Sequence, residues 1–76
     1  MQQSDAFIAV EHELEGATQR YGPFYSAHEG YAIILEEMDE LWSIIKRKPD
    51  SVKLKEMREE AIQVAAMAMR FLIDVC

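Results

Sequence analysis

The sequence contains one cysteine, two prolines and three glycines, and it has no long hydrophobic run. The cysteine is Cys76, so no disulfide can form within the chain, which is typical of proteins in a reducing compartment. Residues 1–5 show no basic segment leading into an apolar one, so no signal peptide is evident. The longest apolar run, residues 64–69, is far too short to span a bilayer. We therefore expect a cytoplasmic protein with no membrane partner.

Positive charge is also scarce, because 14 acidic residues face 8 basic ones and the formal net charge is −6. This balance argues against a broad basic surface for duplex DNA or for anionic lipid, and it disfavours a DNA-binding helix-turn-helix. It does not exclude a nucleotide, because divalent cations can bridge acidic side chains to phosphates.

Half of the 76 residues are hydrophobic, which is ample for the core of a single domain spanning residues 1–76. Three amphipathic helices can cover only part of one another's apolar faces. The remaining apolar surface predicts a homo-oligomer, either a homodimer or a homotetramer.

Glycine or proline interrupts the chain at residues 21–23 and 48–51. Between these breaks, apolar residues recur at three- and four-residue steps, which is typical of helices. We predict helices over residues 5–21 and 27–48, and from residue 51 nearly to the end. The expected fold is all-α. It consists of a three-helix unit with an antiparallel α-hairpin, crossed by the first helix and assembling into an oligomeric helical bundle of the four-helix kind.

Side chains suited to capping precede each predicted helix. Ser26 is followed three residues later by Glu29, which is the spacing of a capping box. The candidate caps of the other two helices are Ser4 or Asp5, and Asp50 or Ser51.

Glutamates gather on one sector of the second predicted helix, within residues 36–40. Glu37 lies three residues before Glu40, and Glu36 lies four residues before it, so the three carboxylates crowd together. Like charges at this spacing cost a few tenths of a kcal/mol per pair, roughly, and a bound cation would remove that cost. Oxygen-rich sets suit Mg²⁺, Mn²⁺ or Ca²⁺. The alternative interpretation is an acidic solvated face.

A second polar row interrupts the apolar third helix. In an antiparallel hairpin, the start of this row would face the acidic sector of the second helix. Its members are Glu60, Gln63, Arg70 and Asp74.

The two rows resemble the motifs of the all-α nucleotide pyrophosphohydrolases, the MazG-like family with its dimeric dUTPase relatives. That family carries E-E-x-x-E on one helix and E-x-x-D on the next. The first motif is complete at residues 36–40, and the second, at residues 60–63, has Gln63 in place of the usual Asp. There are 19 residues between Glu40 and Glu60, which is compatible with the family's hairpin. The resemblance covers roughly residues 26–75, and residues 26–32 and 63–68 are similar to short phage-type members.

This resemblance implies hydrolysis of a nucleoside triphosphate to a monophosphate and pyrophosphate. Glu37, Glu40, Glu60 and Gln63 would then bind Mg²⁺, with Mn²⁺ as a substitute. Glu36 would support the metal or orient the attacking water, and Glu36 or Glu37 would accept its proton. The neutral amide of Gln63 should weaken metal binding.

Three further residues are weaker candidates for substrate contact: Arg70, Trp42 and His28. Arg70 is equally placed to pair with Asp74, Trp42 suits a core or an interface, and His28 suits a solvated or capping first turn. The alternative function is a non-catalytic or degenerate helical assembly module of the same fold. Gln63 favours that alternative, whereas the intact first motif argues against it.

Overall fold

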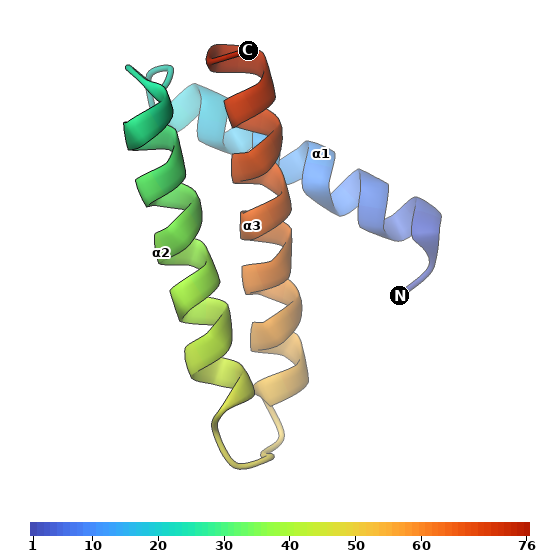
Figure 1. The fold of residues 1–76 in the computed structure, drawn as a ribbon. Coiled ribbons are helices and arrows are strands. Elements are labelled where there is room, and N and C mark those ends of the chain that lie inside the picture. The colour runs from blue at the N-terminus through green and yellow to red at the C-terminus, as the bar shows by residue number, and fades with distance from the viewer.

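The computed structural model describes residues 1–76 and consists of three α-helices without strands (Figure 1). These are α1 (Gln3–Arg20), α2 (Ala27–Ile45) and α3 (Lys53–Asp74). The prediction of an all-α chain with three helices is therefore confirmed. None of the helices combines the length and the apolarity needed to cross a membrane.

The cap of α2 is the one that the sequence identifies. The Ser26 hydroxyl accepts a hydrogen bond from the Glu29 backbone N–H at 3.1 Å. The Glu29 carboxylate accepts from the Tyr25 N–H at 3.4 Å, one residue earlier than in a standard capping box. Glu29 thus ties the connection between α1 and α2 to the start of α2.

The predicted caps of the other two helices are wrong. Helix α1 begins at Gln3, so Ser4 and Asp5 lie within its first turn, where the Asp5 carboxylate still faces the positive end of the helix dipole. Helix α3 begins after Val52, whose N–H donates to Asp50 Oδ1 at 3.0 Å. Asp50 therefore stabilises the turn before the helix rather than the helix itself.

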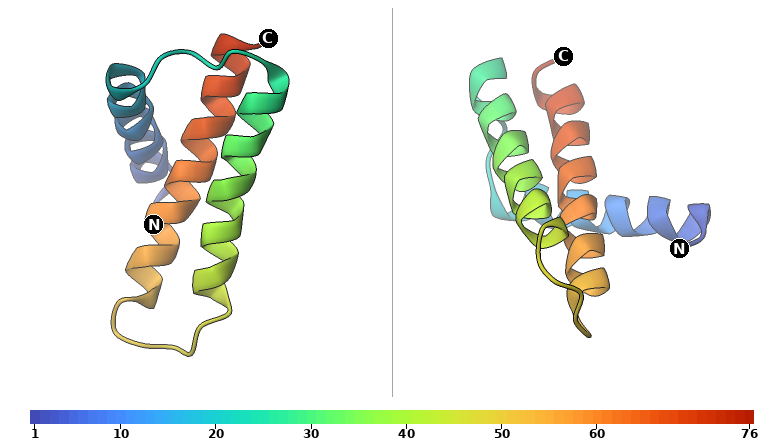
Figure 2. Two further views of the ribbon diagram at one scale, coloured as in Figure 1. Left: turned by 90° about the vertical axis from the view of Figure 1, so that its left-hand side faces the viewer. Right: turned by 60° about the horizontal axis from the view of Figure 1, so that its bottom comes forward.

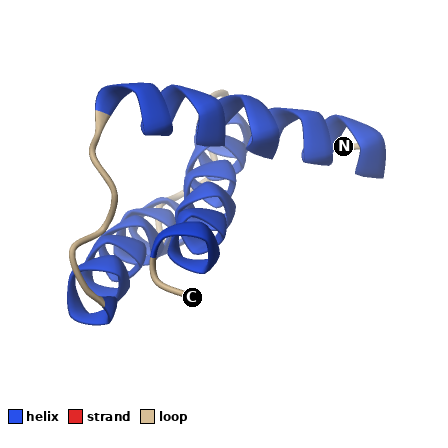
Figure 3. Cartoon of the chain, turned by 90° about the horizontal axis from the view of Figure 1, so that it is seen from above, coloured by secondary structure: helices blue, strands red, loops and turns tan.

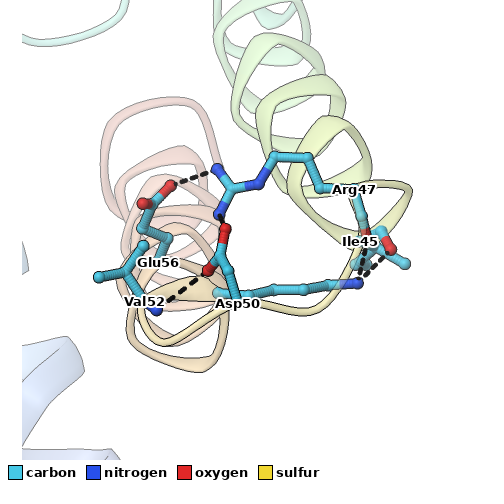
Figure 4. A network of polar contacts seen from close by, with 6 residues as sticks. Ile45, Arg47, Asp50, Val52 and Glu56 are labelled. Carbon is cyan, nitrogen blue, oxygen red and sulfur yellow. Dashed lines mark hydrogen bonds and ion pairs between the residues drawn. The ribbon is translucent and has the colours of Figure 1, made fainter.

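Helix α2 ends at Ile45, three residues before the predicted end at residue 48. The Lys53 ammonium donates to the carbonyl oxygens of Ile45, at 2.8 Å, and of Arg47, at 2.6 Å (Figure 4). These bonds satisfy carbonyls that the helix leaves without partners, and Pro49 prevents its continuation. A residue of the following helix therefore fixes where α2 stops.

The loop between α2 and α3 is also held by an exposed ionic network. The Arg47 guanidinium donates to Glu56 at 2.8 Å and to Asp50 at 3.5 Å (Figure 4). The Glu56 carboxylate raises the pKa of Arg47 above its usual value, chiefly by accepting this hydrogen bond. The network joins both ends of the loop to the first turns of α3.

Helices α2 and α3 lie side by side, and the chain reverses direction in the loop between them (Figure 1). Gly30 is buried where the start of α2 meets the C-terminal part of α3. A Cβ atom at this position would lie 2.6 Å from Cδ2 of Phe71 and 3.0 Å from Cδ2 of Phe24. Because no side chain fits there, Gly30 permits the close approach of α2 to the Phe71 ring.

Helix α1 crosses α3 and contacts it rather than α2 (Figure 3). The N-terminal half of α1 extends past the other two helices (Figure 2). The buried core is small and lies where α1, α3 and the α1–α2 connection meet. Its hydrophobic members are Ala17, Phe24, Ala66 and Met67.

The connection between α1 and α2 is clamped to the C-terminal end of α3. Arg70 is only 5% exposed, and its guanidinium donates to the Gly22 carbonyl at 2.6 Å and stacks over the Phe24 ring at 4.4 Å. Asp74 accepts from the Phe24 N–H at 3.1 Å and pairs with Arg70 at 3.9 Å. The pair expected from sequence at this i,i+4 spacing is thus present, and it fixes the wall of the cavity described next.

Candidate metal centre

Three of the predicted carboxylates converge between α2 and α3. Glu37 and Glu40 project from neighbouring turns of α2, and Glu60 projects from α3. One carboxylate oxygen of each lies within 4.8 Å of the other two. Glu37 and Glu60 are partly buried and Glu40 is exposed, so the cluster lies at the mouth of the groove between the helices.

The electrostatics of this cluster disfavour three negative charges. Burial, followed by the hydrogen bond shared with Glu37, raises the pKa of Glu60 to about 7. Burial also raises the pKa of Glu37, and the neighbouring carboxylates of Glu40 and Glu36 add to this effect. The Glu60 Oε2 atom is buried and has no hydrogen-bond partner. A cation would relieve both the repulsion and the unsatisfied oxygen, so this set of hard donors can hold a metal ion.

The cluster borders a half-open cavity of about 1010 Å³ that is lined by α1, the α1–α2 connection, α2 and α3. This volume is at the upper end of the usual range for small-molecule sites. The carboxylates of Glu36, Glu37, Glu40 and Glu60 line one part of it. Away from the cluster the lining is mixed. Its aromatic and apolar members are Tyr21, Phe24, Tyr25, Ile33 and Met67, and its charged members are Arg20, Glu29 and Arg70.

Gln63 also lines the cavity, but its amide nitrogen is bonded to α1 and not to the cluster. It donates to Glu13 Oε1 at 2.8 Å, and the Arg20 guanidinium donates to the same oxygen at 3.2 Å. Glu13 is a cavity residue that the sequence analysis did not identify. A signal existed, because Glu13 lies three residues after Val10 and four before Ala17, at the edge of the buried face of α1.

The three weaker candidates are not brought to the carboxylates. Arg70 lines the cavity, but the clamp already engages its guanidinium. Trp42 is 57% exposed, lies outside the cavity lining and has Lys46 Nζ at 5.6 Å from its ring. Trp42 follows Glu40 by two residues, which is about 200° around the helix axis. His28 is exposed in the first turn of α2 and does not line the cavity.

Chemically, the arrangement combines hard oxygen donors for a cation with a cavity whose far wall can pack against a planar, apolar group. Comparisons of the chain with protein-family models, with curated proteins and with solved structures find no match. The resemblance to the MazG-like family therefore rests on the sequence itself: the two motifs, their spacing, and the segments at residues 26–32 and 63–68.

Proposed function

We propose that this chain is a Mg²⁺-dependent nucleoside triphosphate pyrophosphohydrolase, which converts a nucleoside triphosphate to a nucleoside monophosphate and pyrophosphate. The observation that carries the proposal is the convergence of Glu37, Glu40 and Glu60 within 4.8 Å at the edge of a cavity of about 1010 Å³. An acidic cluster alone would repel a polyphosphate. A divalent cation between the carboxylates and the polyphosphate would make the two complementary, and the adjoining aromatic side chains suit a nucleobase.

The donor set fits the proposed metal, because Mg²⁺ and Mn²⁺ prefer carboxylate and amide oxygens. Glu37, Glu40 and Glu60 hold the cation, with Gln63 as the neutral fourth member of the set. When bound, the metal neutralises phosphate charge and acidifies a coordinated water. Glu36 lines the cavity beside the cluster and is exposed, so its carboxylate can orient the attacking water and accept its proton. The water oxygen bonds to phosphorus as the link between the α- and β-phosphoryl groups breaks.

The proposal includes a homodimer or homotetramer, which would complete a helical bundle. Tyr31, Leu35, Met38, Trp42 and Ile45 follow one another at steps of four, three, four and three residues along α2. All five are exposed, by 39 to 63%. This spacing is that of a coiled-coil seam, and we call these five residues the α2 stripe. A second copy of the same helix is the natural cover for it.

Calorimetric titration with Mg²⁺ and Mn²⁺, and a pyrophosphate-release screen over all common nucleoside triphosphates, test the enzymatic proposal. Glu60→Gln should abolish metal binding and turnover. Glu59→Gln removes the same charge from the adjacent exposed position, where Glu59 pairs only with Lys55, and should change neither. Absence of metal binding and of pyrophosphate release in the unaltered chain would refute the proposal.

One observation favours the second candidate, a non-catalytic assembly module. The Gln63 amide nitrogen is engaged by Glu13, so this residue acts as a structural link between α1 and α3. For such a module we expect the oligomer to form with unchanged stability in Mg²⁺ and in a chelator. An enzyme would instead be stabilised by the metal, because a ligand that binds only the folded state raises its stability.

A further inference from the structure

We propose that Glu13 recognises the sugar of the nucleotide, so that the protein binds ribonucleotides more tightly than 2′-deoxyribonucleotides. The inference rests on the function proposed above and deepens it by naming the substrate class. It is carried by the position of Glu13 in the cavity and by the hydrogen bonds of its two carboxylate oxygens.

Glu13 lies midway along the cavity. It is bonded to Gln63, which is one helical turn along α3 from Glu60, while Met67 is one further turn away. With a rise of about 1.5 Å per residue, Gln63 is about 4.5 Å and Met67 about 10 Å from Glu60 along the helix axis. Glu13 is therefore level with the middle of the cavity, between the carboxylates and the aromatic wall.

The two parts of the cavity fix the direction in which a nucleotide lies. The phosphates belong beside Glu37, Glu40 and Glu60, where a cation joins them to the protein. Tyr21 and Tyr25 line the part of the cavity away from the glutamates and are 61% and 94% exposed. The Arg20 guanidinium lies over the Tyr21 ring at 5.7 Å from its centroid, whereas the Tyr25 ring has no such partner and can stack on a planar base. The sugar connects base and phosphates and is consequently placed at the level of Glu13.

The hydrogen bonds of Glu13 leave one of its oxygens free for a ligand. The Gln63 amide and the Arg20 guanidinium both donate to Oε1, at 2.8 and 3.2 Å. No protein group donates to Oε2. The side chain is thus held in one orientation while Oε2 retains its full capacity to accept. An ionised carboxylate only accepts hydrogen bonds, and the sugar hydroxyls are donors that match it.

The structural link that Glu13 makes between α1 and α3 uses only Oε1, so it leaves Oε2 for a ligand. The Arg20 side chain is 55% exposed, so its ion pair with Glu13 contributes little to stability. A ribose would add a charge-assisted hydrogen bond from its 2′-hydroxyl, which a deoxyribose lacks.

The test compares matched pairs of nucleotides, in Mg²⁺, in the unaltered chain and in variants of α1. The measurements are kcat/KM for ATP against dATP and for GTP against dGTP, and Kd for AMP against dAMP. We expect a preference of about tenfold or more for each ribonucleotide. Glu13→Gln and Glu13→Ala should reduce this preference to about twofold by weakening only the ribonucleotide. Glu15→Gln makes the same charge change on an exposed position of α1 outside the cavity and should preserve the preference.

Three results would overturn the inference. Equal binding of both sugars by the unaltered chain contradicts the role of Glu13 and leaves the proposed function standing. An equal loss for both sugars in the Glu13 variants, together with a lowered Tm, assigns Glu13 a structural role only. Absence of nucleotide binding and of metal binding in the unaltered chain removes the proposed function and the inference together.

Discussion

At the scale of single residues, the glutamates between α2 and α3 link the stability of the protein to pH and to metal. The pKa of Glu60 is about 7 in the folded chain, against an ordinary value of 4.5. Between these values the folded state binds more protons than the unfolded state, so the free energy of unfolding falls as pH rises from about 4.5 to about 7. The raised pKa of Glu37 acts in the same direction.

The first prediction is that this loss of stability is reversed by metal. In a chelating buffer, the midpoint of urea unfolding should decrease between pH 5 and pH 7.5. Excess Mg²⁺ should restore the midpoint at pH 7.5. It should have little effect at pH 5, because protons compete for the same carboxylate oxygens. Glu60→Gln should flatten the pH dependence and remove the response to Mg²⁺. A midpoint that responds equally to Mg²⁺ in the Gln variant would show that the ion acts elsewhere.

The second prediction concerns Gln63, the one uncharged member of the proposed ligand set. Gln63→Asp adds a carboxylate beside Glu60, so Mg²⁺ should bind more tightly by about tenfold, and pyrophosphate release at limiting metal should increase. Without metal, the added like charge should cost about 1 kcal/mol of unfolding free energy. The appropriate measurements are calorimetric titration and chelator-buffered urea unfolding.

Gln63→Asn is the matched control for this substitution. It shortens the side chain equally and loses the bond to Glu13, but it adds no charge. The difference between the Asp and Asn variants therefore isolates the carboxylate. If the two variants match each other in Mg²⁺ affinity and in stability without metal, position 63 does not belong to a metal site.

At the scale of helices, alanine substitutions at two glycines distinguish a position where helices pack closely from one where only helix propensity matters. Gly30→Ala places a methyl group against the Phe71 and Phe24 rings, at 2.6 and 3.0 Å, and should cost about 1–3 kcal/mol. Gly16→Ala meets only the mobile guanidinium of Arg20 at 3.1 Å and should stabilise α1 by up to about 1 kcal/mol. Urea unfolding of both variants tests this third prediction. Equal effects at the two positions would contradict the close approach of α2 to Phe71.

The same scale shows which features the sequence could predict. Helical periodicity and the two Gly/Pro breaks are local, so they predicted three helices and the Ser26 cap of α2. The predicted end of α2, at residue 48, was wrong because Lys53, on the next helix, caps the carbonyl of Ile45. Local spacing likewise placed Glu37 and Glu40 on one sector of α2, whereas Glu60 was assigned to them from the expected antiparallel hairpin and from the family resemblance.

The rest of the site depends on contacts that no local pattern contains. Glu13 and Gln63 are 50 residues apart, and only the crossing of α1 over α3 brings them together. Arg70 is a weak candidate for substrate contact from the sequence, whereas its contacts with Gly22 and Phe24 arise from the path of the α1–α2 connection. Trp42 is different, because the angle between successive residues of a helix is sufficient to place it on another face of α2 than Glu40.

At the scale of the whole molecule, the chain exposes more surface than a compact monomer of its size. Its accessible area is 5686 Å², whereas a monomer of this mass is expected to expose about 4800 Å². The excess of roughly 900 Å² is close to the area that each partner buries in a standard interface. Only 6 of the 76 residues are buried, and many large hydrophobic side chains remain exposed.

The fourth prediction is that a second copy covers the α2 stripe. The unaltered chain should scatter light as a dimer or tetramer at micromolar concentration. Leu35→Gln combined with Met38→Gln removes two adjacent members of the stripe without changing the charge beside the glutamates, and should yield monomers whose Trp42 emission shifts to longer wavelength. Leu54→Gln changes a leucine in the first turn of α3 that is even more exposed than Leu35, at 68% against 41%, and lies outside the stripe. This substitution should leave assembly and emission unaltered. A monomeric parent chain would contradict the interface altogether, and a double variant that assembles like its parent would place the interface elsewhere.

Assembly can also affect the metal site, because Glu37 and Glu40 lie on the same helix as the stripe. If loss of assembly is accompanied by weaker Mg²⁺ binding, contact between copies holds α2 in the position that the carboxylates need.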